Sequence, residues 1–142
     1  MIAVDSNVLV MAHREETSGH EGGLAVLRGL AEGTAPWGIP VFVLGEFLRV
    51  VTHPRVFGPP SSIEEAFEFL AGILGSPSSR LLLPSTRYWV TFRDAATQAG
   101  ATGNLVFDAQ IAAVCLENSA TTILTEDRDF HRFQGLTVRS VG

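Results

Sequence analysis

Apolar and polar positions along the chain form two kinds of stretch. Short apolar, β-prone stretches predict strands at residues 2–5, 80–83, 121–125 and 137–139, and prolines restrict residues 36–40 to a short extended piece. Apolar positions at helical spacing predict helices at residues 7–14, 21–32, 41–52, 63–74, 88–99, 105–118 and 128–133. Strands that alternate with helices predict an α/β fold in which helices cover both faces of a mainly parallel sheet.

The composition is that of a globular domain. The chain has 142 residues, of which 46% are hydrophobic and 18% charged. The loop-like stretches at residues 58–62 and 75–79 are too short to separate two cores, so we expect one domain spanning residues 1–142. The N-terminus lacks a basic segment with a cleavage motif, and no apolar run approaches the roughly 20 residues of a membrane span. We therefore expect no association with a membrane.

The single cysteine, Cys115, bears on the compartment. It lies within the apolar run AAVCL and has no second cysteine with which to form a disulfide in this chain. A reduced cytoplasm is the natural setting for such a protein. We expect Cys115 to be a small core residue rather than a nucleophile.

Charge narrows the possible chemistry further. All ten basic residues are arginines, and the absence of lysine excludes the P-loop lysine, a Schiff base and every other mechanism that requires one. The net charge of −5 looks unfavourable for a nucleic-acid partner. However, five of the fifteen acids occupy the positions discussed next, and the ten that remain equal the arginines in number. An acidic pocket that binds divalent cations explains this surplus.

Two acids follow predicted strands. Asp5 ends the first strand and Asp127 follows the strand at 121–125, and ligands of open α/β sheets bind at this edge. Each of these acids also precedes a helix, so capping of that helix is the alternative for both. Asp129 lies two residues beyond Asp127, and either an additional place in the site or a position at the helix start accounts for it.

Two further acids lie in apolar helices. Glu46 has apolar neighbours on nearly every side, and a buried carboxylate is costly unless it is paired or bound to metal. A solvated edge or a salt bridge, to Arg49 or Arg14, is the alternative. Asp108 lies near the start of the helix at 105–118, where the helix dipole alone accounts for an acid, but its apolar surroundings indicate a buried pocket.

These acids together predict a metal site. Carboxylates that converge raise one another's pKa and need a counter-charge, which without lysine is arginine or a divalent cation. Hard oxygen ligands favour Mg²⁺ or Mn²⁺, and the Cys/His spacing of a zinc site is lacking. Such a site can activate a water to hydrolyse a phosphodiester without a protein nucleophile, with Asp127, Asp129 or a metal-bound water assisting proton transfer.

The same residues carry a family resemblance. The sequence resembles the PIN-domain family and, within it, the VapC-type toxins of bacterial toxin–antitoxin pairs. The matching segments span nearly the whole chain in the order of the family: VDSNVL at residues 4–9, EF at 46–47, DAQIA at 108–112, TEDRDF at 125–130 and FQGL at 133–136. The resemblance implies a three-layer α/β/α sandwich with a sheet of four to five strands.

The resemblance also implies a function. Its four acidic ligands carry over onto Asp5, Glu46, Asp108 and Asp127, and the activity is RNA cleavage with Mg²⁺ or Mn²⁺. It places Ser6 and Asn7 where they would orient Asp5 or a water on the metal, and gives Thr125 a similar supporting role. It further implies a homodimer, a small antitoxin protein as partner and inhibition of translation.

Two other classes of function fit parts of this pattern. A PIN-like module that binds RNA or protein without cleaving it has no need of all four acids. Phosphatases of the haloacid dehalogenase type and receiver domains both need a lysine, and the former needs an aspartate where Asn7 stands.

Several residues outside the acidic set stay open. His53 and Arg55 can contact RNA phosphate or form an ordinary surface turn. Arg128, beside Asp127, is equally ambiguous. Trp37 and Trp89 fit core or dimer contacts better than stacking on RNA bases.

Overall fold

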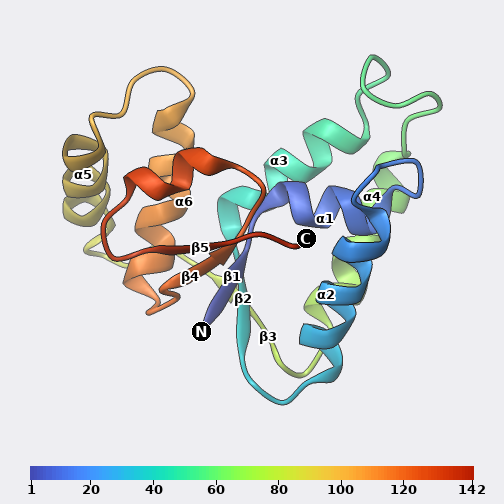
Figure 1. The fold of residues 1–142 in the computed structure, drawn as a ribbon, viewed down its shortest axis with the longest axis horizontal. Helices are drawn as coiled ribbons and strands as arrows, with labels where there is room; N and C mark the ends of the chain where they lie inside the picture. The colour runs from blue at the N-terminus through green and yellow to red at the C-terminus, as the bar shows by residue number, and fades with distance from the viewer.

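The computed structural model describes residues 1–142, and a sheet of five parallel strands lies at its centre (Figure 1). The strands are arranged in the order β3-β2-β1-β4-β5, and each neighbouring pair is parallel. The elements follow one another as β1 (Ile2–Val4), α1 (Ser6–His13), α2 (His20–Glu32), β2 (Trp37–Pro40), α3 (Val41–Val51), α4 (Ile63–Leu74), β3 (Ser79–Leu82), α5 (Tyr88–Ala99), α6 (Leu105–Glu117), β4 (Thr122–Leu124), the 3-10 helix η1 (Arg128–Arg132) and β5 (Thr137–Arg139). The predicted α/β class is confirmed.

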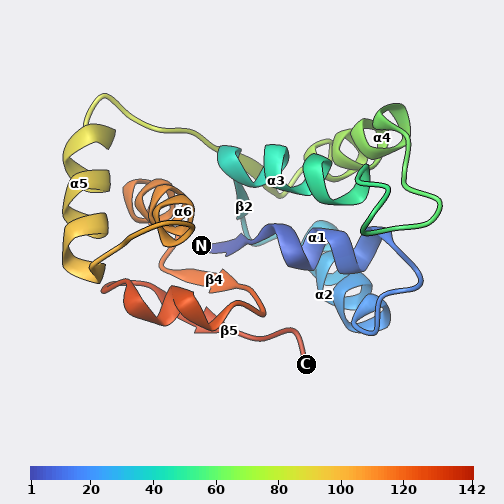
Figure 2. The ribbon, with the colours of Figure 1, turned by 90° about the horizontal axis from the view of Figure 1, so that it is seen from above.

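Helices cover both faces of this sheet. Figure 2 shows α5 and α6 on one side, and α1 to α4 on the other. The three-layer α/β/α sandwich is therefore confirmed, and its sheet is parallel throughout rather than only mainly so. None of the helices is long and apolar enough to cross a membrane.

Twenty-nine buried apolar residues form one cluster between these layers. Trp37, only 1% exposed, is one of its largest members, and its indole N–H donates a hydrogen bond to Ser78 Oγ at 3.1 Å. Cys115 is also buried, and burial raises the pKa of its thiol to about 12. Trp37 and Cys115 are thus core residues, as the sequence suggested, whereas Trp89 is 68% exposed and does not belong to the core.

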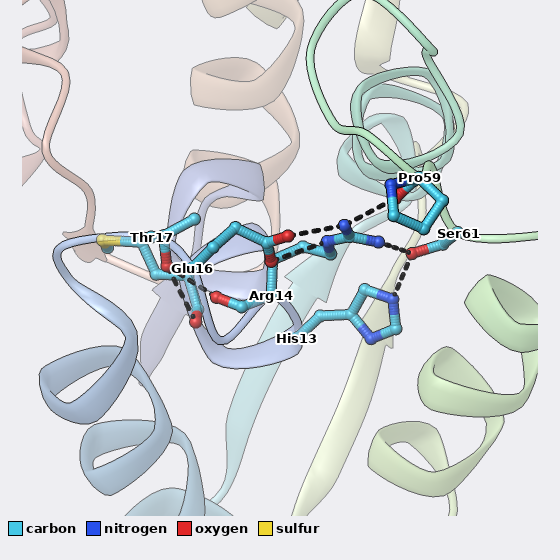
Figure 3. Close-up of polar contacts among 7 residues, drawn as sticks. His13, Arg14, Glu16, Thr17, Pro59 and Ser61 are labelled. Carbon is cyan, nitrogen blue, oxygen red and sulfur yellow. Dashed lines mark hydrogen bonds and ion pairs between the residues drawn. The ribbon is translucent and has the colours of Figure 1, made fainter.

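The end of α1 holds the long connection between α3 and α4 (Figure 3). Arg14 donates hydrogen bonds to the carbonyl oxygen of Pro59 at 2.7 Å and to Ser61 Oγ at 2.9 Å, and its guanidinium lies 4.5 Å from the centre of the Phe57 ring. His13 Nε2 lies 2.9 Å from the same Ser61 hydroxyl. Burial, together with the charge of Arg14, lowers the pKa of His13 below its usual value, which favours a neutral ring. Arg14 is therefore a structural clamp for this connection.

Candidate functional site

Two neighbouring strands end at acids that the sequence singled out. Asp5 directly follows β1, and Asp127 lies in the loop that follows β4. The two strands pair in parallel with Val4 opposite Leu124, and the Asp5 N–H donates to the Leu124 carbonyl at 3.0 Å. This register brings both loops to the carboxyl edge of the sheet, where α/β proteins bind their ligands.

The carboxylate of Asp5 is surrounded by hydrogen-bond donors. It is 3% exposed, and its Oδ1 accepts from the Ser6 N–H at 2.8 Å. Its Oδ2 accepts from Thr125 Oγ1 at 2.7 Å and from Asn7 Nδ2 at 3.3 Å. Asp5 is also the N-cap residue of α1. Capping and a place in the acidic site are therefore compatible for this residue.

Burial raises the pKa of Asp5 to about 6, against the effect of the hydrogen bonds from Thr125 and Ser6. The negative charges of Glu46 and Asp127 raise the same pKa further. Both carboxylates are thus close enough to Asp5 to repel it. The three acids come from three separate elements of the fold.

The hydroxyl of Thr125 links the two strand ends. Besides donating to Asp5, its Oγ1 accepts hydrogen bonds from Asn7 Nδ2 and from the Asp127 N–H, both at 3.0 Å. The side-chain oxygen of Asn7 in turn accepts from the Glu126 N–H at 3.2 Å. These contacts tie the start of α1 to the loop after β4, and both Thr125 and Asn7 contact the carboxylate of Asp5.

Glu46 is half-buried on α3, and its Oε1 accepts a hydrogen bond from Ser6 Oγ at 2.7 Å. Neither Arg49 nor Arg14 forms an ion pair with it: Arg14 is paired with Glu16 at 2.7 Å, and Arg49 takes part in no ion pair. The salt-bridge alternative for Glu46 is therefore wrong. Ser6 contacts Asp5 through its backbone and Glu46 through its hydroxyl. Sequence reasoning missed the second contact because it joins residues 40 positions apart.

Three further carboxylates approach one another closely. Asp108 lies in the first turn of α6, and one carboxylate oxygen each from Asp108, Asp127 and Asp129 lie within 4.8 Å of one another. Asp127 caps η1, and its Oδ1 accepts from the Asp129 N–H at 2.9 Å. The sequence left the relation between Asp127 and Asp129 open, and the structure brings both of them to Asp108.

Of these acids, Asp108 has the most strongly raised pKa. Partial burial raises its pKa to about 7, and the negative charges of all the other acids named here, Asp127, Asp5, Glu46 and Asp129, add to the effect. The ion pairs of the chain, Arg14–Glu16 and Arg93–Asp94, involve none of them. The cluster thus lacks a counter-charge of its own.

The donor set at this edge fits a divalent cation. Carboxylate oxygens are hard ligands of the kind that Mg²⁺ and Mn²⁺ prefer, and those of Asp108, Asp127 and Asp129 are close enough together to share one ion. A bound cation also supplies the positive charge that the raised pKa values of Asp5 and Asp108 indicate is missing.

The arginine and histidine that follow α3 are less informative. His53 and Arg55 are both exposed, and the Arg55 N–H donates to His53 Nδ1 at 3.0 Å. This local contact is that of a surface turn. The structure gives neither side chain a contact with the acidic cluster.

Comparison with known proteins gives consistent results. The PIN domain family model matches residues 2–136. The protein named VapC ribonuclease Mb2897, from Mycobacterium bovis, is 42% identical over 98% of this chain and 94% of its own length. The crystal structure of VapBC2 from Rickettsia felis, bound to a DNA fragment from its promoter, has a TM-score of 0.71 at 20% identity and covers 99% of this chain and 98% of its own. Mycobacterium tuberculosis VapC20, described as a sarcin-ricin loop cleaving toxin, has a TM-score of 0.68 at 18% identity, covering 96% of this chain and 99% of its own.

Proposed function

The chain belongs to the PIN-domain family, and we propose that it is an endoribonuclease that hydrolyses phosphodiester bonds with the help of a divalent cation. The observation that carries this proposal is the gathering of Asp5, Glu46, Asp108 and Asp127 at one sheet edge without an internal counter-charge. The near full-length similarity to a protein named as a VapC ribonuclease supports the choice of RNA as substrate.

In this proposal Asp5, Glu46, Asp108 and Asp127 hold the cation, Mg²⁺ or Mn²⁺, and Asp129 joins them through its proximity to Asp108 and Asp127. The cation supplies the positive charge that makes a water nucleophilic and stabilises the charge that develops on the phosphate. The chain itself supplies no lysine and needs no nucleophilic side chain.

The surrounding side chains set the positions of these carboxylates. Thr125 and Asn7 hold Oδ2 of Asp5, and the Ser6 hydroxyl holds Oε1 of Glu46. Asp129 is exposed and lies close to Asp108 and Asp127, so its carboxylate could accept the proton that an attacking water loses whenever it does not itself bind the cation. Positions fixed in advance in this way spare the site reorganisation during the reaction.

The resemblance to toxins of toxin–antitoxin pairs extends the proposal to partners. We propose that the chain acts as a toxin that inhibits translation in the cytoplasm, forms a homodimer and is neutralised by a small antitoxin protein. Exposed apolar side chains, including Trp89, Val90 and Phe107, offer the kind of surface that protein partners cover.

Cleavage of total RNA tests the proposed activity. We expect the wild-type protein to create new RNA ends in Mg²⁺ or Mn²⁺ and none in EDTA, and Asp5→Ala to create none in either metal. If wild type binds RNA but cuts it with neither metal, the non-cleaving alternative holds instead. If Asp5→Ala cuts as well as wild type, the assignment of the site is wrong.

Ser6→Ala is expected to lower kcat roughly 10-fold, a loss typical of groups that orient metal ligands. The change removes the hydroxyl that holds Glu46 and leaves the backbone N–H that Asp5 accepts. Ser6→Thr keeps the hydroxyl and is expected to retain most of the activity. Rates measured on one RNA at saturating metal check this, and equal losses in both variants would show that steric fit at position 6, not the hydroxyl, matters.

A further inference from the structure

A cavity of about 350 Å³ lies beside the acidic cluster, between η1 and the end of β5. Its walls include Asp127, Arg128 and His131 from the segment after β4, and Val138 and Ser140 from the end of the chain. We propose that this cavity binds one nucleotide of the RNA substrate, adjacent to the phosphate that is cleaved. The inference rests on the proposed function, because it takes the acidic cluster as the place of cleavage.

Asp127 joins the cavity to the cluster. Its carboxylate lies within 4.8 Å of the oxygens of Asp108 and Asp129, and it also lines the cavity. Successive phosphates of a strand are separated by a single ribose. A strand whose phosphate lies at the cluster therefore has a neighbouring nucleotide within reach of the cavity.

Arg128 is free to bind a phosphate there. It takes part in neither ion pair of the chain, although it follows two acids in sequence. The carboxylate of Glu126 is occupied by the C-terminal segment, since its oxygens accept from Ser140 Oγ at 2.9 and 3.1 Å and from the Val141 N–H at 2.7 Å. An unpaired guanidinium beside an acidic cluster is suited to the phosphate oxygens of a strand that crosses both.

The other walls suit a nucleobase. His131 is exposed on η1 and presents an imidazole, a ring on which RNA bases stack. Val138 is the one apolar residue of the lining, so the cavity is too polar for an apolar ligand. Its volume lies in the range of about 300–1,000 Å³ that small-molecule ligand sites have.

A nucleotide fits better than an acidic peptide. The negative charges of Glu126 and Asp127 in the lining act on a peptide carboxylate and on a phosphate alike, so they do not distinguish the two ligands. An RNA strand that also spans the acidic cluster brings its phosphates to the cation proposed there. The arrangement of one arginine and one ring beside a metal-binding cluster thus favours RNA.

RNA binding tests the inference independently of cleavage. Arg128→Ala, His131→Ala and the control Arg132→Ala are made in an Asp108→Asn background, which is expected not to cut. Arg132 lies on the same 3-10 helix and is exposed, but it does not line the cavity. Its replacement by alanine removes the same charge as Arg128→Ala. The probe is a fluorescein-labelled RNA of random sequence, about ten nucleotides long, in Mg²⁺, with binding measured by anisotropy.

We expect Arg128→Ala to raise the Kd about tenfold, as for loss of a charged hydrogen bond to phosphate, and Arg132→Ala to change it less than about twofold. His131→Ala is expected to raise it about fivefold through the loss of base stacking. If Arg128→Ala and Arg132→Ala weaken binding equally, or if Arg128→Ala and His131→Ala bind like their parent, the cavity is not a nucleotide site.

The same substitutions in the cleaving protein give a second readout. We expect Arg128→Ala to raise KM with little change in kcat, and His131→Ala to alter which bases flank the new RNA ends. Unchanged KM and unchanged flanking bases would overturn the inference. If wild type cuts no RNA, the proposed function fails. The anisotropy comparison then still shows whether the cavity binds RNA.

Discussion

Asp108→Asn is expected to abolish RNA cleavage and, at the same time, to raise the free energy of unfolding of the metal-free protein. The loss of activity, at least about 100-fold, follows from removing a carboxylate from the proposed cation site, since even groups that only orient ligands contribute 10- to 100-fold. The gain in stability follows from the pKa of Asp108, which burial and four neighbouring acids raise to about 7.

The sign of the stability effect follows from proton binding. In the unfolded chain the pKa of an aspartate is about 3.9, whereas the pKa of Asp108 in the folded protein is about 7. The folded state therefore binds the proton more tightly, and stability falls as pH rises from about 4 to about 7. Above pH 7 the full penalty of the charged side chain is present, and asparagine removes it.

Asparagine at position 108 removes the charge without disturbing a hydrogen bond. The side chain of Asp108 accepts no hydrogen bond within the chain, so the amide displaces no donor. At Asp5 the same change disturbs hydrogen bonds as well, because an amide nitrogen in place of Oδ2 faces the donating side chains of Thr125 and Asn7. Asp108→Asn therefore isolates the effect of charge.

Urea unfolding in EDTA at pH 8 and at pH 5 checks this prediction. We expect the free energy of unfolding of Asp108→Asn to exceed that of wild type by about 1 kcal/mol at pH 8, after allowance for the partial solvent exposure of the side chain. At pH 5 we expect a smaller difference. Asp94→Asn is the matched control, because Asp94 is exposed on α5 and forms only a surface ion pair with Arg93. A variant that is less stable than wild type at pH 8 would contradict the raised pKa.

Divalent cations are expected to stabilise the wild-type protein strongly. A ligand that binds only the folded state adds about 2.7 kcal/mol to the free energy of unfolding when its concentration is 100 times its Kd. In a domain of this size this corresponds to a rise in Tm of roughly 5–10 °C. The physical reason is that the cation neutralises carboxylates that repel one another at Asp5 and Asp108.

Thermal unfolding in EDTA, in MgCl₂ and in MnCl₂ measures this effect, with NaCl at equal ionic strength as the control for screening. We expect Asp108→Asn to respond much less than wild type, and Asp94→Asn to respond fully. The response of wild type should shrink below pH 6, because the pKa values of Asp5 and Asp108 lie at about 6 and about 7 and protons then compete with the cation. Equal stabilisation by NaCl would refute a specific cation site.

The local pattern of the chain determined most of its secondary structure. The helices Ile63–Leu74 and Tyr88–Ala99 begin and end where the periodicity predicted. Their ends depend on neighbouring residues alone: the hydroxyl of Ser62 accepts from the Glu65 N–H at 3.1 Å, and Gly100 adopts a φ of 62° at the end of α5. Helix caps and turns depend on residues only a few positions apart, so they can be predicted directly from the sequence.

The sequence also placed acids at strand ends, and family resemblance selected four of them. It could not show that Asp129 joins Asp127 within 4.8 Å of Asp108, or that Ser6 holds Glu46. Nor did it single out His131, because nothing in its local sequence marks it as part of a cavity wall.

These relations were decided by the tertiary structure. Strand order β3-β2-β1-β4-β5 places β4 beside β1, and this pairing brings Thr125 to Asp5 across 120 positions of the chain. Which strands become neighbours depends on how the helices pack on the two faces, a property of the whole core rather than of any one segment. The sequence alone thus determined the elements and the type of chemistry, and the packing of the sheet decided which side chains meet.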